Sequence, residues 1–297
     1  MTKKIIIAID AMGGENAPNK NIHGISLFIK KNLVSNDYHF NLYGNEILIK
    51  KELDKYKISK EKITIFNTLS VVSDEETPMT AVKNSKNSSM WNSISAQTNN
   101  NADISLSAGN TGVLLVISRM ILKTMENISR PALAGLWPSK KGMSVVLDLG
   151  ANVECDEKNL IDFSELGSAL YKSIFPKMTP KVSLLNIGSE EIKGTETLKK
   201  AYSKLKEISK YGDFNFEGYI EGNKLMDGAS NVIVTDGFTG NVALKTAEGT
   251  SKFITDSLKE SLNENIFSKI STIFSYYSLK KFKSKLDPRK YNGAIFL

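Results

Sequence analysis

The sequence is poor in the side chains on which many enzymes depend: its 297 residues include one cysteine and two histidines. A lone Cys155 excludes an internal disulfide framework and a metal site built from several cysteines, which fits a reducing cytosol. His23 and His39 both fall in predicted regular elements, so neither a Ser-His-Asp nor a Cys-His catalytic site is expected. The sequence has no H-E-x-x-H motif, and no cluster of carboxylates has the spacing of metal ligands. We therefore expect no metal and no other cofactor.

Long apolar runs and nucleotide-binding signatures are also missing. No apolar run approaches the roughly 18 residues of a membrane-spanning helix. The apolar stretch within residues 1–10 is too short for a signal peptide and is predicted to be a first strand. Neither G-x-G-x-x-G nor G-x-x-x-x-G-K-[ST] occurs, which argues against the common dinucleotide sites and P-loops.

Net positive charge is small outside one segment. Of the net charge of +7, six units lie in residues 266–297, where seven lysines and arginines face a single aspartate. A nucleic-acid enzyme more often spreads its basic residues along a face, so we do not expect a nucleic-acid partner.

Short runs rich in β-branched and aromatic residues alternate with segments of helical periodicity, such as 45–56 and 193–209. This pattern predicts an α/β fold with a mainly parallel sheet flanked by helices. We find no repeat, no linker and no convincing boundary, and therefore treat 1–297 as one catalytic domain. The predicted strands are Lys4–Ile9, His39–Tyr43, Lys62–Phe66, Asp103–Ser107, Ser144–Asp148, Lys181–Asn186 and Asn231–Thr235.

Five of these strands end in loops that combine glycine with asparagine, aspartate or lysine. The loops cover residues 10–18, 109–112, 148–152, 186–194 and 236–241. Ligands of open parallel sheets bind at the carboxyl ends of the strands, so five such loops favour a shared binding site. The alternative is that glycine and asparagine merely serve tight turns.

The residue types in these loops indicate an anion site. They offer backbone N–H groups, amides and two lysines, Lys193 and Lys245. The loop at 109–112 leads directly into an apolar helical pattern, and the N–H groups at the start of a helix attract anions. A phosphate-like group is the natural ligand.

The loops also belong to a longer ordered set of motifs. The set comprises residues 9–18, 88–90, 107–112, 130–133, 147–152, 185–194, 236–245, 248–249 and 293–294. In this order the motifs closely resemble those of the phosphate acyltransferases of bacterial phospholipid synthesis, which make acyl phosphate from acyl-acyl-carrier protein. The resemblance implies a fold similar to isocitrate and isopropylmalate dehydrogenases, with a protruding C-terminal helical region, and a homodimer.

The resemblance further implies that inorganic phosphate attacks the thioester of an acyl carrier protein, and that a membrane glycerol-3-phosphate acyltransferase uses the product. Carried onto this chain, the catalytic residues are Lys193, Asp236, Lys245 and Asn110. The residues expected to bind phosphate or substrate are Asp10, Gly13, Gly14, Gly109, Thr111, Gly112, Arg130, Asn152, Asn186, Glu190, Gly237 and Asn241. Loop capping by its carboxylate is an equal alternative for Asp10, as it is for Asp148.

The chain departs from the family pattern at a few places. Glu15 stands where the family usually has aspartate, and Lys83 where it often has arginine. The usual Gln-Phe-Ala is replaced by 162–164, Asp-Phe-Ser. The family's closing segment, a further strand and helix, is missing after Leu297.

The basic end predicts an amphipathic helical region at about 253–291. Its apolar face includes Ile270 and Phe274, and the cluster Lys280, Lys281 and Lys283 follows. Such a face can pack on its own domain or on a dimer partner. It also suits an anionic membrane surface or the acidic carrier protein. We expect a cytoplasmic protein peripherally associated with the inner face of the cell membrane.

Two other functions stay open. One is a phosphotransacetylase that uses short acyl chains on coenzyme A, or a dehydrogenase of similar fold. The other is a non-catalytic lipid or membrane adaptor built on the same fold.

Overall fold

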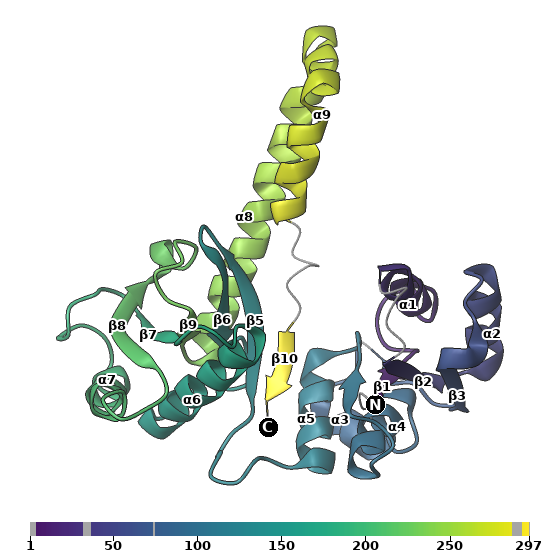
Figure 1. Ribbon diagram of the computed structural model, residues 1–297, viewed down its shortest axis with the longest axis horizontal. Coiled ribbons are helices and arrows are strands. Elements are labelled where there is room, and N and C mark those ends of the chain that lie inside the picture. Colours follow the sequence, from purple (N-terminus) through teal and green to yellow (C-terminus); the bar gives the residue numbers. More distant parts are fainter. Residues whose placement is uncertain (1–3, 32–36, 74, 287–292, 297) are drawn as a thin grey trace. The chain divides into compact units, whose positions relative to one another are not determined.

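Two sheets organise the chain in a computed structural model that describes residues 4–31, 37–73, 75–286 and 293–296 (Figure 1). Each sheet belongs to its own compact unit, residues 1–125 and 126–296. The sequence showed no boundary near Met125, since neither glycine, proline nor a change of composition marks it. That 1–297 works as one catalytic domain stays a prediction.

Unit 1 is built on a four-stranded, wholly parallel sheet of order β3-β2-β1-β4. Its strands are β1 (Ile5–Asp10), β2 (Tyr38–Gly44), β3 (Ile63–Asn67) and β4 (Ile104–Leu106). Its helices are α1 (Asn19–Lys31), α2 (Glu46–Lys55), α3 (Pro78–Asn84), α4 (Ser89–Thr98) and α5 (Thr111–Leu122), with a 3₁₀ turn at Lys60–Lys62.

Alternation along β1 explains how helices cover both faces of this sheet. Ile7 and Ile9 point into a core shared with α1 and α2, where Ile22 and Leu53 are fully buried. Ala8 points to the opposite face and packs beside Ala96 of α4. Buried on both faces, β1 lacks the polar alternation of a half-exposed strand, as expected for a parallel sheet.

Unit 2 contains a six-stranded sheet of order β10-β5-β6-β9-β7-β8. Its strands are β5 (Ala132–Ser139), β6 (Gly142–Leu147), β7 (Lys181–Asn186), β8 (Asn215–Glu221), β9 (Val232–Val234) and β10 (Gly293–Phe296). The four strands β6, β9, β7 and β8 are parallel, while β5 is antiparallel to both β6 and β10. Its helices are α6 (Glu157–Ile174), α7 (Glu196–Ile208), α8 (Gly237–Asn263) and α9 (Ile266–Leu286), with a 3₁₀ turn at Gly222–Lys224.

Helices also cover both faces of the second sheet. On one face, Phe163 of α6 and Leu205 of α7 are fully buried against strand residues such as Leu184. On the other face, Ile233 and its neighbours pack against the first turns of α8, through Leu244 and adjacent alanines. Only the beginning of α8 is therefore anchored in this core.

The α/β class and the mainly parallel sheets confirm the prediction from sequence, and all seven predicted strands occur with ends that agree to within two residues. Three strands were missed. β5 contains Gly135 and Pro138, which are uncommon inside strands. β8 contains Gly218 at a φ of 85° and pairs with β7 across a register shift. β10 lies in a short apolar stretch that the sequence analysis left unassigned.

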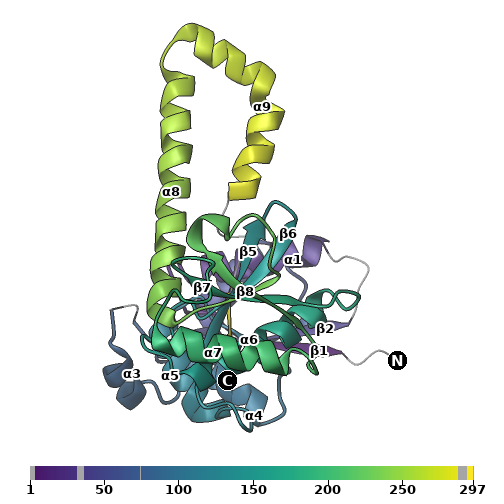
Figure 2. The same ribbon diagram turned by 90° about the vertical axis from the view of Figure 1, so that its left-hand side faces the viewer.

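A helical hairpin, α8 with α9, projects from the sheet of unit 2, as Figure 2 shows. The predicted region 253–291 is helical through 286, apart from a short break after Asn263, and residues 287–292 lie outside the described part. Phe253, Phe267, Phe274 and Tyr277 are all largely exposed. The side chains of Ile270 and Lys283 lie outside the described residues. Among the helices described, none is long and apolar enough to cross a bilayer.

We expect opposite effects from two Gly→Ala changes in α8. A Cβ added at Gly240 would lie 1.9 Å from the carbonyl oxygen of Asp148. A Cβ added at Gly249 would have no atom within 4 Å outside its own stretch of helix. Gly240→Ala should destabilise the protein by about 1–3 kcal/mol through overpacking. Gly249→Ala should stabilise it by up to about 1 kcal/mol through helix propensity. Thermal unfolding of both variants measures this, and equal shifts would contradict the close approach at Gly240.

Candidate functional site

Three neighbouring parallel strands, β6, β9 and β7, end at the same edge of the second sheet. They lead into the loops 148–152, 236–241 and 186–194, three of the five singled out in the sequence. The loops that follow β1 and β4 share an edge of the first sheet. The candidate residues thus form two clusters, one in each unit.

Asp148 holds the loop after β6 in place. Its buried carboxylate accepts five hydrogen bonds, more than any other described side chain in the loop. The donors are the backbone N–H groups of Leu133 (3.0 Å), Gly150 (3.1 Å), Ala151 (3.0 Å) and Asn152 (2.7 Å) and the Asn152 side-chain Nδ2 (2.8 Å). Asn152 Nδ2 also donates to the Pro131 carbonyl at 2.7 Å. Asp148 therefore acts as a loop cap, and the Asn152 side chain is bound internally.

The first turn of α8 lies directly on this loop. The Gly237 N–H donates to the Asn152 carbonyl at 2.7 Å. Asp236 caps the helix, because its two carboxylate oxygens accept from the backbone N–H and the hydroxyl of Thr239, each at 2.8 Å. A Cβ on Gly150 would lie 3.6 Å from the Asn241 side chain, so Asn241 also faces this loop.

Lys193 and Asn186 organise the loop after β7. Asn186 Nδ2 donates to the Lys193 carbonyl at 3.0 Å, and Asn186 Oδ1 accepts from the Ile187 N–H at 2.8 Å. The Lys193 ammonium lies 2.8 Å from the Glu190 carboxylate. The Glu190 hydrogen bond raises the pKa of Lys193, and the same contact lowers the pKa of Glu190.

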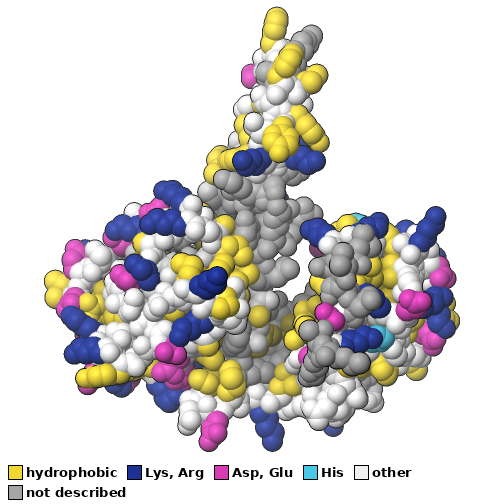
Figure 3. Space-filling view, in the orientation of Figure 1, with side chains coloured by type: hydrophobic (Ala, Val, Ile, Leu, Met, Phe, Trp, Pro, Cys, Tyr) yellow, Lys and Arg dark blue, Asp and Glu magenta, His cyan; other side chains and the backbone are white. Residues whose placement is uncertain are grey.

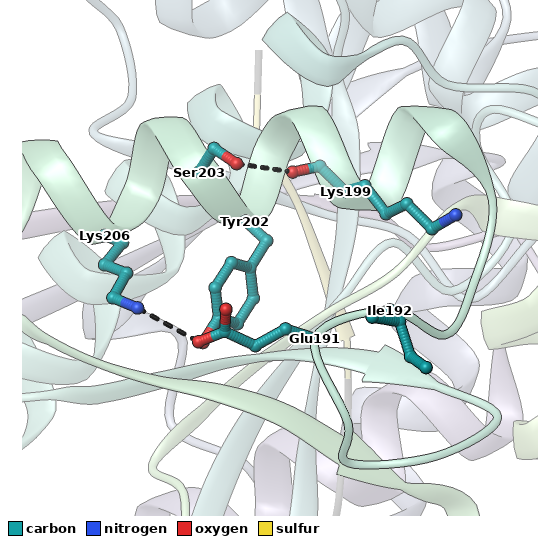
Figure 4. Close-up of a pocket in the computed structure, with 6 residues that line it drawn as sticks. All are labelled: Glu191, Ile192, Lys199, Tyr202, Ser203 and Lys206. Carbon is teal, nitrogen blue, oxygen red and sulfur yellow. Dashed lines mark hydrogen bonds and ion pairs between the residues drawn. The ribbon is translucent and has the colours of Figure 1, made fainter.

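A pocket of about 490 Å³ is lined by residues of this loop and of α7 (Figure 4). Tyr202 donates to Glu191 Oε1 at 2.6 Å, and Lys206 contacts the same oxygen at 3.0 Å. Burial, followed by the Glu191 contact, raises the pKa of Tyr202 to about 12. Neither Glu191 nor Tyr202 was singled out from the sequence; together they tie the loop that carries Lys193 to α7.

The other predicted residues of unit 2 lie nearby. Lys245 is exposed on α8, pairs with Glu248 at 2.9 Å and lies one turn beyond Asn241. Arg130 donates to the Glu154 carbonyl at 2.8 Å, just past the loop of Asp148. No described contact links Asp236 to either lysine.

Cys155 also borders this cluster, with Sγ 3.9 Å from the Asn152 carbonyl. Burial, with a smaller contribution from Asp148, raises the pKa of its thiol to about 12. A thiol with this pKa is protonated at neutral pH and is a poor nucleophile. Cys155 is therefore more suited to packing than to nucleophilic attack.

In unit 1, Asp10 joins the loops after β1 and β4. Its carboxylate is 1% exposed and accepts from the Ser107 hydroxyl at 2.7 Å, and Ser107 Oγ accepts from the Gly109 N–H at 3.1 Å. Burial raises the pKa of Asp10. A Cβ on Gly13 would lie 2.4 Å from Asp10, and one on Gly14 would lie 2.5 Å from the Ala108 carbonyl. These glycines allow the two loops to touch.

Asn110 caps α5. Its Oδ1 accepts from the N–H groups of Gly112 at 3.0 Å and Val113 at 3.2 Å, while Nδ2 donates to the Glu76 carbonyl at 3.2 Å. An anion that uses those two N–H groups must therefore displace the Asn110 side chain. Binding at 109–112, including by Thr111, stays a prediction.

The histidines lie away from these loops: His23 stacks on Tyr56, and His39 Nε2 is 2.8 Å from the Thr64 hydroxyl. Within the described part of the chain, no group of three or more His, Cys, Asp or Glu side chains is arranged to hold a metal ion. The Asp162 that departs from the family pattern pairs with Lys158 at 2.8 Å and anchors Ser129, two residues before Pro131.

The fold of this chain is shared with solved phosphotransacetylases. Solved structures with this fold include a phosphotransacetylase from Streptococcus pyogenes (TM-score 0.61, 15% identity, 84% of this chain and 82% of that one). Another is the EutD phosphotransacetylase from Staphylococcus aureus (TM-score 0.58, 16% identity, 84% and 83% covered). At such identities the likeness concerns the fold alone.

Sequence relatives show the family to which the chain belongs. The family model "Fatty acid synthesis protein" matches residues 5–297. The phosphate acyltransferase of Pelagibacter ubique is 53% identical over 297 residues, covering all of this chain and 87% of that protein. That of Ehrlichia ruminantium is 42% identical over 293 residues, with 99% and 85% covered. The chain belongs to the phosphate acyltransferase family, and it is an acyltransferase.

We expect Asp10→Asn to change how stability depends on pH. Because the folded pKa of Asp10 is raised, the folded state holds the proton more strongly than the unfolded state does. The Asp10 contribution is therefore greatest at acidic pH and falls as pH rises from the unfolded pKa through the folded pKa. In urea unfolding, wild type should lose stability relative to Asp10→Asn as pH rises above the ordinary aspartate pKa of about 4. Asp213→Asn, at an exposed carboxylate, controls for the lost charge, and a wild-type advantage that grows with pH would contradict the prediction.

Proposed function

We propose that this chain transfers a fatty acyl group from acyl-acyl-carrier protein to inorganic phosphate, giving acyl phosphate for phospholipid synthesis. A phosphate oxygen attacks the thioester carbonyl carbon, the carbon–sulfur bond breaks, and the carrier's thiolate leaves and takes a proton from water. The observation that carries the proposal is the group of amide- and lysine-bearing loops at the carboxyl ends of β6, β9 and β7, in a member of this family.

This chemistry suits a site without histidine or a reactive thiol. Phosphate is largely a dianion near neutral pH and needs no proton removed, and a thiolate is a tolerable leaving group. The main task is to hold two negatively polarised partners together, which fixed donors and positioning perform. A donor aimed at the developing oxyanion contributes about 3–4 kcal/mol.

Lys193 and Lys245 are the proposed phosphate ligands. Each ammonium pairs with a glutamate three residues away, Glu190 and Glu248 respectively, in an exposed contact. Such surface pairs are weak because water screens them, so phosphate can replace the glutamate at little cost. Asn241 lies beside the Asp148 loop and is proposed to orient the substrate.

Asp236 and Asn110 are proposed to act through the helix ends that they cap. Asp236 fixes the start of α8 and with it Asn241 and Lys245. Asn110 fixes the start of α5. The glycines of these loops permit the close contacts, and Arg130 and Glu190 border the same cluster.

A phosphotransacetylase that uses short acyl-coenzyme A is the second candidate, because the solved phosphotransacetylases share this fold. Assays that offer the same acyl group on coenzyme A and on carrier protein distinguish the two. An adaptor without catalysis predicts acyl phosphate from neither donor.

We also propose that the enzyme is a cytoplasmic homodimer that binds the anionic membrane surface through the α8–α9 hairpin. Figure 3 shows apolar side chains along this hairpin together with basic ones. Phe274 is 86% exposed, and Lys280 and Lys281 are exposed one to two turns further on. A peripheral position would deliver acyl phosphate to a membrane glycerol-3-phosphate acyltransferase.

Lys193→Ala and Lys245→Ala should each raise the KM for phosphate about tenfold, because each removes a charge-assisted contact. The assay is acyl phosphate formation from acyl-carrier protein at varied phosphate concentration. Lys199→Ala is the matched control, since Lys199 pairs with Glu196 three residues away at 3.0 Å. Normal phosphate saturation in both test variants would make these lysines structural.

Phe274→Ser should weaken binding to vesicles that contain anionic lipid about tenfold, since an inserted aromatic side chain contributes about 1.5–3 kcal/mol. Binding should also fade with salt, because each nearby basic residue contributes about 1 kcal/mol. Vesicle sedimentation measures both effects. Tyr211→Ser, at an exposed aromatic outside the hairpin, is the control. If neutral and anionic vesicles bind equally, the electrostatic contribution is absent.

A further inference from the structure

Large apolar side chains stand exposed among the polar residues of the second sheet's carboxyl edge. They are Val153, Ile187, Phe238 and Val242, with exposed fractions of 69%, 82%, 63% and 52%. Each immediately follows a residue of the candidate anion site in the sequence: Asn152, Asn186, Gly237 and Asn241. All three loops of the cluster thus pair a polar residue with an exposed apolar one.

The spacing on α8 places both kinds of residue on one helix face. Residues three or four positions apart lie on the same side of a helix. This spacing brings four residues to one side of the first turns of α8: Phe238, Asn241, Val242 and Lys245. The opposite side, with Leu244, packs into the core of unit 2. Because the side with Leu244 is packed in the core, the side with Phe238 and Val242 faces away from the core.

The backbone beside the other two apolar residues is fixed as well. Ile187 donates its N–H to Asn186 Oδ1 at 2.8 Å. Val153 follows Asn152, whose N–H, carbonyl and side chain are all bound. These apolar groups are presented to water by a well-bonded framework, and exposed apolar groups gathered at a polar site favour an amphipathic ligand.

We propose that Val153, Ile187, Phe238 and Val242 bind the alkyl chain of the acyl substrate. This inference rests on the proposed function, because the acyl carbonyl must meet phosphate at the anion site. The chain is bonded to that carbonyl and must leave across the adjoining surface. The four apolar side chains form that adjoining surface. The polar residues next to them bind the phosphate that reacts with the acyl carbonyl.

Alkyl phosphates test the chain site without catalysis. Octyl phosphate and butyl phosphate share a head group, and each additional buried methylene strengthens binding up to about fourfold. By calorimetry, wild type should bind octyl phosphate at least about tenfold more tightly than butyl phosphate. Phe238→Ser should weaken octyl phosphate binding about fivefold and butyl phosphate binding by a smaller factor, so that the preference for the longer chain falls. Serine is tolerated in the first turn of a helix, so the fold should persist.

Two matched variants sharpen the result. Tyr211→Ser removes an aromatic that is 91% exposed in the loop before β8, at the opposite end of the strands, and should change nothing. Met79→Ser removes an exposed apolar side chain next to Pro78, which lies beside Gly112 in unit 1. If Met79→Ser, and not Phe238→Ser, lowers the octyl preference, the chain lies on unit 1 and the proposal is overturned.

Equal affinity of wild type for the two alkyl phosphates also overturns the proposal. So does a Phe238→Ser variant that dissociates a dimer while keeping the octyl preference, since the surface is then an interface between copies. The proposed function fails separately, if wild type binds octyl phosphate preferentially and yet forms no acyl phosphate from acyl-carrier protein.

Discussion

The carboxylate of Asp148 is the contact on which the second cluster depends. It gathers the N–H groups of a whole loop, and the shape of that loop leaves room for α8 only where Gly237 and Gly240 have no side chain. A carboxylate that accepts five hydrogen bonds has no remaining capacity for a ligand, so its contribution is to position others. Asn152, Asn241 and the start of α8 all take their places from it.

The site proposed on this contact would rely on fixed dipoles rather than on proton transfer. The carboxylates of Asp148, Asp236 and Asp10 are engaged with backbone or hydroxyl donors, and the lysines form exposed pairs. At the second sheet, the groups that set the loop geometry are distinct from the lysines that are proposed to bind, so a charged ligand would require little reorganisation there. The carboxylates that hold the loops and the exposed cations thus have separate proposed tasks.

The sequence predicted the α/β class, seven strands and the polar loops, because parallel strands carry a strong β-branched signal and their turns need glycine and asparagine. It missed β5 and β8, whose glycines and proline obscure the pattern, and the boundary near Met125, which no composition change marks. Glu191, Tyr202 and Ser107 were also missed. Their roles come from partners up to 97 residues apart in sequence, as for Ser107 with Asp10, and tertiary pairing leaves no local signal.

The length of α8 has a mechanical consequence. At 27 residues it extends roughly 40 Å, with one end clamped by a carbonyl and the other far from the sheet. A rod of that length turns a tilt of about five degrees at the clamp into a movement of about 3–4 Å at its tip. Conversely, a force applied at the tip would be transmitted along the helix to the turns that carry Asn241 and Lys245. A small change of tilt in the first turns of α8, where the chemistry is proposed to occur, thus corresponds to a much larger movement at the far end of the helix.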